Sequence, residues 1–534
     1  MRLPARLILA AAAGAAVALA FPPYGWWPLL LVGLLCLIAL LHGLAPGRGA
    51  LVGLVFGVAY MGLLLPWMRV NGADSWVGLT ILESLFFGAF GWAAARVRTH
   101  RWWPLATPAL WAGVEMVRSH VPFTGFPWGK IAFALTDSPL AAYVRYLGVP
   151  ALGALVVLLV AVLWWAILRL PGTGKRSLPA AATATIGVIA VLAAGAVLPV
   201  GLAGEQRPVR VAAVQGGIPG TGANGMGEQR EVVANHARAT QQYAADVRAG
   251  EATAADVVIW PENSTDIDPL TDAQTAATIA SAADAVNVPM LVGALTAGST
   301  PHTLRNVGIV WSPTTGPGDM YVKRNLVPFG EYIPMRDLIA PLISRLDQIP
   351  RDFEAGEQVG VLDLGPVVVG DAMCYDVAFE GVAAPAVRAG AELLVVQTNN
   401  ATYVETGQPA QQWAISRMRA LETGRDLVVA STNGISGIVA ADGDVLSKST
   451  DSDAVVLTAT VHRADGLTSA VRFGTVLEWG LALLGLLALL ATLLTGARGE
   501  RPRASSTGSA AERTASDRVD QGATGPPREP VGQP

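Results

Sequence analysis

Long apolar stretches dominate the first two hundred residues of the chain. Each approaches the roughly 20 apolar residues needed to cross a bilayer. A last such stretch follows a long, more polar middle region. The pattern predicts a polytopic α-helical membrane bundle of about eight spans. The candidate spans cover residues 6–21, 27–45, 50–67, 76–95, 103–118, 149–169, 180–202 and 475–495.

The first apolar stretch also fits a signal peptide. Arg2 and Arg6 precede an Ala-rich core, as in a secretory leader. A second apolar stretch follows almost at once, which favours a retained span.

The middle region alternates short β-rich apolar runs with stretches of helical periodicity, which indicates an α/β sandwich. We expect domains at residues 1–206 (seven spans), 207–465 (the sandwich), 466–497 (the final span) and 498–534. Residues 498–534 are rich in Arg, Ser, Gly, Thr and Pro, which predicts a disordered tail. The expected strands are 209–215, 256–260, 289–295, 306–311, 366–372, 392–398, 426–432 and 453–461, and the expected helices are 227–249, 270–287, 380–390 and 408–424.

Composition agrees with a membrane protein, since 52% of the residues are hydrophobic and 15% are charged. The formal net charge of −4 excludes nucleic acid as the main partner, because no basic surplus exists to neutralise phosphates. The chain has 2 cysteines, Cys36 and Cys374. Cys36 lies inside a predicted span, so we expect Cys374 to be a free thiol and no metal cluster to form.

Basic residues fall on alternate loops between the spans, which the positive-inside rule assigns to the cytoplasm. The sandwich should then face outside the cell membrane, with the tail in the cytoplasm. The loop between the fifth and sixth spans carries Arg118, Lys130 and Arg145 against this trend. It contains the aromatic segment V-P-F-T-G-F-P-W-G-K, and we expect it to be more than a connector.

Three polar residues of the middle region lie at or just beyond apolar runs. Glu262 follows V-V-I-W-P, Lys323 lies in M-Y-V-K-R-N, and Cys374 follows V-V-V-G-D-A-M. Taken singly, each has a simple structural interpretation: a turn cap, a solvated charge and a small buried hydrophobe. Taken together, a carboxylate, an ammonium and a thiol at strand ends indicate nucleophilic catalysis.

These motifs resemble the carbon–nitrogen hydrolase (nitrilase-like) family over residues 207–461. The resemblance rests on W-P-E-N, Y-V-K-R-N-L-V-P-F-G-E-Y-I-P, C-Y-D, S-R-M-R-A-L-E-T-G-R and S-T-N-G. It implies an αββα sandwich with Glu262 as general base, Lys323 beside the oxyanion and Cys374 as nucleophile. Glu331 matches a second glutamate of the family, which would hold Lys323 and place an incoming amine.

The whole chain, apart from the tail, is similar to the bacterial apolipoprotein N-acyltransferases. V-Q-G-G-I-P (214–219), T-G-F-P-W (124–128) and the spans on both sides carry this resemblance. It implies transfer of an acyl group from a membrane phospholipid to a diacylglyceryl-lipoprotein through a Cys374 thioester. Both substrates are lipids held in the membrane, and the family's triad needs no cofactor or metal.

Some residues depart from the family pattern. Tyr375 and Asp376 match a Tyr-Glu pair, so the acid is one methylene shorter, and residues 398–407 differ from the usual N-D-A-W-F-G. These departures concern the acyl or lipoprotein pocket rather than the triad. Glu115 and Arg118 fit either a structural ion pair or a substrate contact.

Two other functions fit parts of the pattern. A membrane-tethered amide or nitrile hydrolase would use the same triad, but eight spans would be superfluous for small soluble substrates. A transporter or a scaffold with an outside binding domain would have more intramembrane charge than Glu83, Glu115 and Glu478 supply.

Overall fold

The structure is a computed structural model that describes residues 1–169, 177–218, 230–449 and 453–499. The chain forms two units, Met1–Thr492 and Leu493–Pro534. The first contains all the elements discussed below except the end of the last helix. The predicted disordered tail, 498–534, lies almost entirely outside the described residues.

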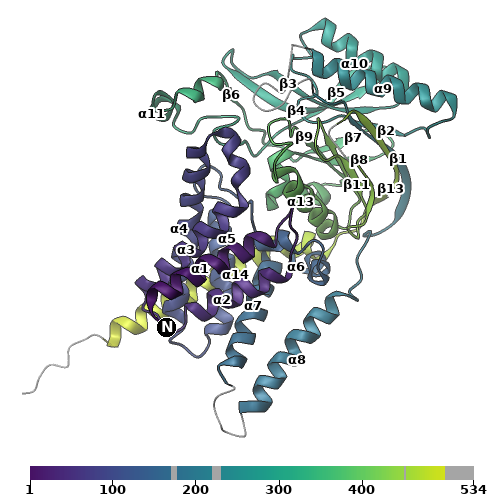
Figure 1. Cartoon of the computed structure of the whole chain (residues 1–534). Helices are drawn as coiled ribbons and strands as arrows, with labels where there is room; N and C mark the ends of the chain where they lie inside the picture. Colours follow the sequence, from purple (N-terminus) through teal and green to yellow (C-terminus); the bar gives the residue numbers. More distant parts are fainter. Residues whose placement is uncertain (170–176, 219–229, 450–452, 500–534) are drawn as a thin grey trace, which may run out of the picture. The chain divides into compact units, whose positions relative to one another are not determined.

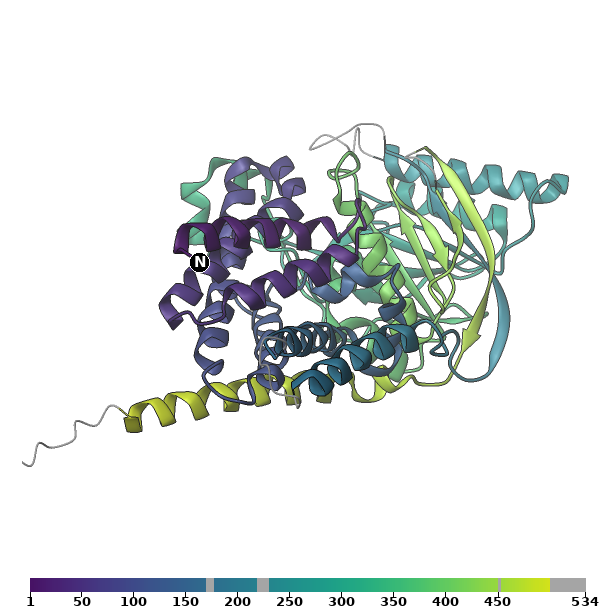
Figure 2. The ribbon, with the colours of Figure 1, turned by 60° about the horizontal axis from the view of Figure 1, so that its bottom comes forward.

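The N-terminal part of the first unit is a bundle of apolar helices, drawn in purple to dark blue in Figures 1 and 2. Pro occupies the first turn of several of them, where its missing N–H leaves no hydrogen bond unmade. The helices are α1 (Leu3–Leu19), α2 (Pro28–Leu40), α3 (Pro46–Leu64), α4 (Ala73–Val97), α5 (Trp103–Arg118), α6 (Val144–Leu147), α7 (Val149–Ile167) and α8 (Ser177–Gly195), and α14 (Ser469–Gly499) follows the sandwich.

Among the described residues, 4 helices are long and apolar enough to cross a membrane: α3, α4, α7 and α14. Helices α1 and α2 are apolar but shorter, as is the described apolar part of α8, Ala181–Gly195. Pro108 lies inside α5, which also carries the buried Glu115 and Arg118. The chain is therefore a membrane protein with several apolar helices.

Helices α3 and α4 pack closely because glycines face each other across their interface. A Cβ on Gly53 would lie 2.1 Å from the Phe87 carbonyl oxygen, and one on Gly91 would lie 2.3 Å from the Gly49 carbonyl oxygen. Small residues of this kind allow helix backbones to approach within van der Waals contact in a membrane. Any larger residue at these two positions would separate the helices.

The middle of the chain forms the predicted sandwich of two sheets. The first has 7 strands in the order β13-β1-β2-β3-β4-β5, with β6 paired to β4. Strands β1, β2 and β3 run parallel, connected by α9 (Glu231–Ala249) and α10 (Ala273–Val286). Its strands are β1 (Gln206–Gln215), β2 (Val257–Ile259), β3 (Met290–Ala297), β4 (Thr303–Ser312), β5 (Gly316–Val322), β6 (Asp352–Phe353) and β13 (Val455–Ala464).

The second sheet has 6 strands in the order β12-β11-β10-β9-β8-β7. Strands β8, β9 and β10 run parallel, and α12 (Glu380–Arg388) and α13 (Gln408–Thr423) connect them. Its strands are β7 (Val361–Asp363), β8 (Val368–Met373), β9 (Leu393–Thr398), β10 (Leu427–Ser431), β11 (Gly437–Val439) and β12 (Val445–Lys448).

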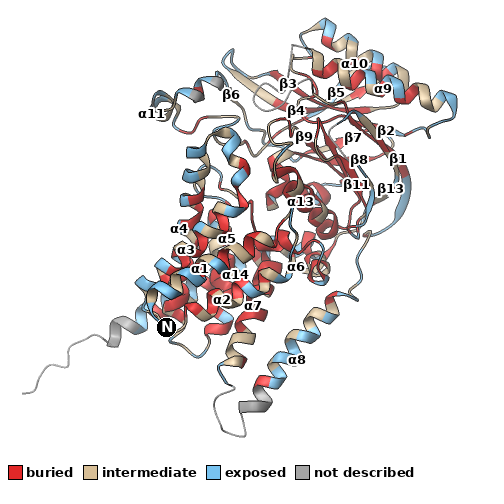
Figure 3. Ribbon diagram, in the orientation of Figure 1, coloured by how far each residue is buried: buried red, intermediate tan, exposed pale blue. Residues whose placement is uncertain are grey.

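Successive side chains along a strand point alternately into the core between the two sheets and toward the outer helices. On β8, Val369 and Met373 belong to the apolar core between the two sheets, whereas Ala372 packs toward the helices. Helices α9 and α10 cover the outer face of the first sheet, and α12 and α13 cover that of the second (Figure 1). Figure 3 shows the strands and the inner helix faces as buried. This is an αββα sandwich of the nitrilase-like type.

All eight expected strands and all four expected helices are present, with ends shifted by a few residues. Residues 227–229 of the helix expected at 227–249 lie outside the described residues. The strands that were not expected, β5, β6, β7, β11 and β12, are short or polar. β5 has the sequence G-P-G-D-M-Y-V and is mostly exposed, so it lacks the continuous apolar run of a central strand.

Candidate active site

Each of the three predicted residues follows the carboxyl end of a strand. Glu262 lies just beyond β2, Lys323 directly follows β5, and Cys374 directly follows β8. Polar residues that follow strands of both sheets thus lie in one region of the sandwich. The fold brings together residues that are 61 and 51 positions apart, and their charges interact.

Lys323 is held between two carboxylates. Its Nζ donates to Glu262 Oε1 and to Glu331 Oε1, both at 2.9 Å. The side chains of Lys323 and Glu262 are only 2% and 4% exposed. Asn306 Nδ2 donates to the same two carboxylates, at 2.7 Å to Glu262 and 3.1 Å to Glu331. One ammonium and one amide therefore fix the spacing of both acids.

The remaining oxygen of each acid accepts from the backbone. Glu262 Oε2 accepts from the amide of Asn399 at 3.0 Å, and Glu331 Oε2 accepts from the amide of Val327 at 2.7 Å. Such bonds set the orientation of a carboxylate more firmly than side-chain contacts do, because the backbone cannot rotate away. Glu331 lies in the turn F-G-E-Y, whose first residue, Phe329, has a left-handed backbone conformation with a φ of 61°.

Burial and opposite charge act against each other in this cluster. Burial raises the pKa of Glu262, while Lys323 lowers it and Glu331 raises it again. The two carboxylates more than offset the effect of burial on Lys323, whose pKa stands well above its usual value. Lys323 is therefore a permanent ammonium, and the cluster has one more carboxylate than ammonium.

The backbone of Cys374 is strained. Its φ is 47°, in the left-handed region that non-glycine residues seldom adopt. The residue ends β8 and begins a short 3₁₀ turn, Cys374–Ala378. Strain of this kind persists only where the surrounding structure enforces it, and it turns the side chain out of the strand. Cys374 and Cys36 are both free thiols, as predicted.

The resting cysteine is a thiol rather than a thiolate. Burial raises the pKa of Cys374 to about 12, and the negative charge of Glu262 adds to this effect. Lys323 and a hydrogen bond from the Thr398 hydroxyl act in the opposite direction. To act as a nucleophile, this thiol would need a proton acceptor, and Glu262 is the buried carboxylate that interacts with it most strongly.

Tyr375 and Asp376 have structural partners that fix the loops on either side of the cluster. Asp376 Oδ1 accepts from both the amide and the side chain of Asn325, and its Oδ2 accepts from Tyr321. Tyr375 donates to the Gly125 carbonyl oxygen at 3.0 Å. Asp376 therefore holds the segment after Lys323, and Tyr375 reaches the aromatic loop of the helix bundle.

That aromatic loop docks on the sandwich, so it is more than a connector. Trp128 Nε1 donates to Gln411 Oε1 at 2.7 Å, and the Trp128 ring stacks at 19° on that of Tyr375. Gln411 also accepts from Trp67 and donates to the Leu64 carbonyl oxygen. One buried amide of α13 thus joins the loop and the end of α3 beside the residue that follows Cys374.

A buried ion network fastens the same loop to helices α12 and α13. Lys130 and Arg419 both pair with Glu380, at 3.0 and 2.9 Å, and Arg419 also pairs with Glu422. The two cations lower the pKa of Glu380 to about 2 although it is buried. Lys130, one of the three basic residues that depart from the positive-inside pattern, therefore serves an internal contact.

The Glu115–Arg118 ion pair that was one of two expectations does not form. Arg118 pairs with Glu83 of α4 at 3.0 Å and donates to the Phe126 and Trp128 carbonyl oxygens. Glu115 instead accepts from the backbone amide of Ile131 at 3.1 Å. Both side chains hold the aromatic loop, because that loop folds back over the end of α5.

Sequence reasoning missed Asn306 and Gln411. Asn306 directly precedes the apolar run V-G-I-V-W. A polar residue in that position could have been named as a candidate site residue. Gln411 lies in the polar helix α13, which is buried along most of its length because other segments cover its outer side. The polar sequence of α13 is typical of a helix with a solvated face, so it does not reveal the buried contact of Gln411.

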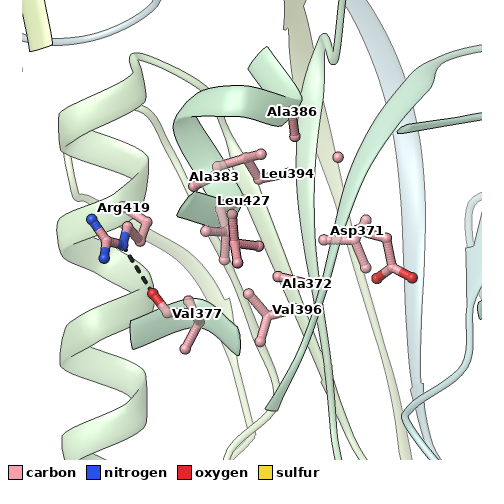
Figure 4. A pocket seen from close by; sticks show the side chains of 12 residues that line it. Asp371, Ala372, Val377, Ala383, Ala386, Leu394, Val396, Arg419 and Leu427 are labelled. Carbon is pink, nitrogen blue, oxygen red and sulfur yellow. Dashed lines mark hydrogen bonds between the residues drawn. The ribbon is translucent and has the colours of Figure 1, made fainter. Parts of the chain in front are cut away.

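A small cavity lies apart from this cluster, between β8–β10 and helices α12 and α13 (Figure 4). Apolar side chains such as Val396 and Leu427 line it, together with Arg419. It does not contain Cys374. Among the described residues, no group of three His, Cys, Asp or Glu side chains is placed to hold a metal ion.

Two family models match the two main parts of the chain. The family model of the apolipoprotein N-acyltransferase N-terminal domain matches residues 13–163, and that of the carbon-nitrogen hydrolases matches residues 210–467. Among solved structures, a nitrilase-superfamily protein of Saccharomyces cerevisiae is 15% identical, with a TM-score of 0.36, and the match covers 48% of this chain and 90% of that one.

Curated relatives match nearly the whole chain. The apolipoprotein N-acyltransferase of Mycolicibacterium smegmatis is 38% identical over 501 residues, covering 90% of this chain and 84% of that protein. The one of Pseudomonas aeruginosa strain LESB58 is 30% identical over 518 residues, covering 90% and 95%. The helix bundle, the sandwich and the length of these matches lead to one conclusion: the chain belongs to the apolipoprotein N-acyltransferase family.

Proposed function

We propose that the chain moves a fatty acyl group from a membrane phospholipid to the N-terminal α-amine of diacylglyceryl-cysteine in lipoproteins, with Cys374 as the nucleophile. Membership of the family makes the chain an N-acyltransferase of lipoprotein maturation. The donor, the acceptor and the roles of the individual residues are our proposals. They are supported above all by the placement of Lys323 between Glu262 and Glu331 beside a partly buried thiol.

In the first half-reaction, Glu262 takes the proton of the Cys374 thiol as the sulfur attacks an ester carbonyl of the phospholipid. The carbonyl oxygen becomes an oxyanion, and the Lys323 ammonium, together with the backbone amide after Cys374, stabilises it. A single such donor is typically worth about 3 kcal/mol of the barrier. The C–O ester bond then breaks, and Glu262 returns the proton to the departing lysophospholipid oxygen, leaving a thioester.

In the second half-reaction, the α-amine of the lipoprotein attacks the thioester carbonyl. Glu262 takes a proton from the amine and gives it to the Cys374 sulfur as the C–S bond breaks, which releases the acylated lipoprotein and restores the thiol. Glu331 borders the same ammonium from the other side and is 13% exposed, so it is the more accessible acid. We assign to it the holding of Lys323 and the placing of the incoming amine, and to Tyr375 and Asp376 the support of the substrate pocket.

The membrane arrangement follows from the same proposal. We place about eight spans in residues 1–206 and 466–497, the catalytic domain 207–465 on the extracytoplasmic side, and residues 498–534 in the cytoplasm. The distribution of Arg and Lys over the loops supports this orientation. Both substrates are lipids, so a bundle that meets the sandwich near Cys374 suits a reaction at the membrane surface.

The activity is tested on the product. Mass spectrometry of a lipoprotein N-terminus, from cells with and without this chain, should show one additional amide-linked acyl group only when the chain is present. Cells that express the Cys374→Ala variant are the matched control and should resemble cells without the chain. An acylated N-terminus in the absence of the chain would contradict the proposal.

A further inference from the structure

Asp371 is a buried acid on the strand that carries Cys374. It lies on the same face of β8 as Val369 and Met373, whose side chains fill the core between the sheets. Figure 4 shows its carboxyl group on the opposite side of the strand from Arg419. Asp371 is 1% exposed, so its carboxyl group lies between the two sheets, away from water.

Neither carboxyl oxygen of Asp371 has a hydrogen-bond partner of normal geometry. On the neighbouring strand β9, Gln397 is fully buried, and its Oε1 also lacks a partner. Gly308 of β4 leaves room for both oxygens: a Cβ at Gly308 would lie 2.3 Å from Asp371 Oδ2 and 2.8 Å from Gln397 Oε1. Two unpaired acceptors therefore converge on one point of the core.

Two acceptors that converge on one point without a donor would repel each other, and an unsatisfied buried acceptor is costly. A protonated Asp371 removes both penalties, because its O–H can donate to Gln397 Oε1. The charged form has no compensation nearby, since no cation among the described residues contributes to the electrostatic environment of Asp371. The titratable groups around it are Asp376, Glu262 and the Tyr321 hydroxyl.

The electrostatic environment agrees with this geometry. Burial raises the pKa of Asp371 well above its ordinary value, and the charges of Asp376 and Glu262 raise it further. The adjacent amide of Ala372 lowers it. This environment favours the neutral form of the carboxyl group.

Gln397 carries the contact to the other sheet. Its Nε2 donates to the Trp260 carbonyl oxygen at 2.5 Å. Trp260 directly follows β2, two residues before Glu262, and its side chain is fully buried. A chain of two hydrogen bonds can thus run from the strand of Cys374 to the segment that presents Glu262.

We propose that Asp371, as a neutral acid, donates to Gln397 and thereby positions the Trp260–Glu262 segment against Cys374. Asp371 touches no substrate in this proposal, so it is a positioning residue. The proposal rests on the roles assigned above to Glu262 and Cys374. The protonation state of Asp371 does not depend on those roles and can be measured separately.

Two variants separate the proposal from a merely structural role. Asp371→Asn keeps the shape and supplies an N–H donor to Gln397, so acylation of Cys374 by phospholipid should stay within about threefold of wild type. Asp371→Leu keeps the volume but removes the donor, so acylation should fall at least tenfold. Asp363→Asn, an exposed acid of β7, is the matched control and should change nothing.

Infrared difference spectroscopy of the purified full chain tests the proton directly. The wild type minus Asp371→Asn spectrum at neutral pH should contain the carbonyl stretch of a protonated carboxylic acid, and the Asp363→Asn spectrum should not. The alkaline limb of the acylation rate should also move to higher pH in Asp371→Asn, because an amide cannot lose the proton.

Absence of the protonated-acid band would overturn the proposal, whatever the activity of the chain. Equal loss of acylation in Asp371→Asn and Asp371→Leu would overturn it as well, because only one of them lacks the donor. If instead Cys374 proved not to be acylated at all, the proposed function would fail while the infrared band would still report the neutral acid.

Discussion

Lys323 and Glu262, 61 positions apart in the sequence, form an ion pair of 2.9 Å that is almost completely buried. The same ammonium binds Glu331 at the same distance. A single cation facing two carboxylates leaves one negative charge in the cluster. That charge adds to the effect of burial in keeping Cys374 protonated at rest, and in the proposed mechanism it is the acceptor for the thiol proton during attack.

The first prediction concerns the nucleophile. Cys374→Ala should lower the rate of acyl transfer by at least about 10³-fold, because no other group can form the thioester. Cys374→Ser should be nearly as inactive, since a hydroxyl is far harder to ionise beside the same base. Transfer is measured by mass spectrometry of a lipopeptide acceptor. Cys36→Ala is the control and should keep normal activity; substantial turnover by Cys374→Ala would exclude covalent catalysis at this residue.

The second prediction separates the two groups that flank the site. Lys323→Met keeps the length but removes the charge beside the oxyanion, so thioester formation should slow by about 10²–10³-fold. Glu331→Gln leaves the base in place and should show a milder defect, concentrated in transfer to the amine. Single-turnover kinetics of each half-reaction measure the difference. Equal slowing of both half-reactions in Glu331→Gln would contradict its assignment.

The third prediction is the pH dependence of Cys374 alkylation. Its pKa is raised to about 12, so the thiol form persists through neutral pH and the thiolate appears only as the pH rises. At pH 8 its thiolate fraction should be roughly a thousandfold below that of an ordinary cysteine of pKa about 8.5. Iodoacetamide labelling in the Cys36→Ala background should therefore be slow in the native protein and fast after unfolding.

Lys323→Met serves as the test of the cause. Lys323 lowers the pKa of Cys374, so its removal should slow the labelling further at every pH below 12. Rapid labelling of native Cys374 at pH 7 would mean that the resting site holds a thiolate, and the assignment of Glu262 as proton acceptor would lose its basis.

The fourth prediction concerns topology. From the loop charges we predict that residues 207–465 lie outside the cell membrane and residues 498–534 in the cytoplasm. Reporter fusions at about residues 220 and 510 should therefore give opposite signals, one typical of the extracytoplasmic side and one of the cytoplasm. Signals on the same side would contradict the eight-span arrangement.

The central strands could be predicted because their chemistry is local. Strands such as β9, L-L-V-V-Q-T, are buried on both faces and read as continuous apolar runs. The exposed β5 could not, since its pairing with β4 rather than its composition makes it a strand. The lengths of the spans were also hard to predict. Helices α1 and α2 are apolar, but the length of each helix differs from the length of the apolar run that predicted it.

The site was only partly predictable for the same reason. Glu262, Lys323 and Cys374 follow strands and match family motifs, so each could be named from its local sequence. Asn306 and the backbone amide of Asn399 act on Glu262 across the fold, and nothing in their own segments indicates the partner. Contacts between distant segments depend on strand order, which the sequence pattern leaves open.

The fifth prediction tests the central claim, that Glu262 activates Cys374 for acyl transfer. Purified chain is incubated with phospholipid and no acceptor, and its intact mass is recorded over time. Wild type should gain one acyl group on Cys374 with stoichiometric release of lysophospholipid. Glu262→Gln keeps the size but cannot take the proton, so its acylation should become very slow. Acylation of Glu262→Gln at the wild-type rate would contradict the account.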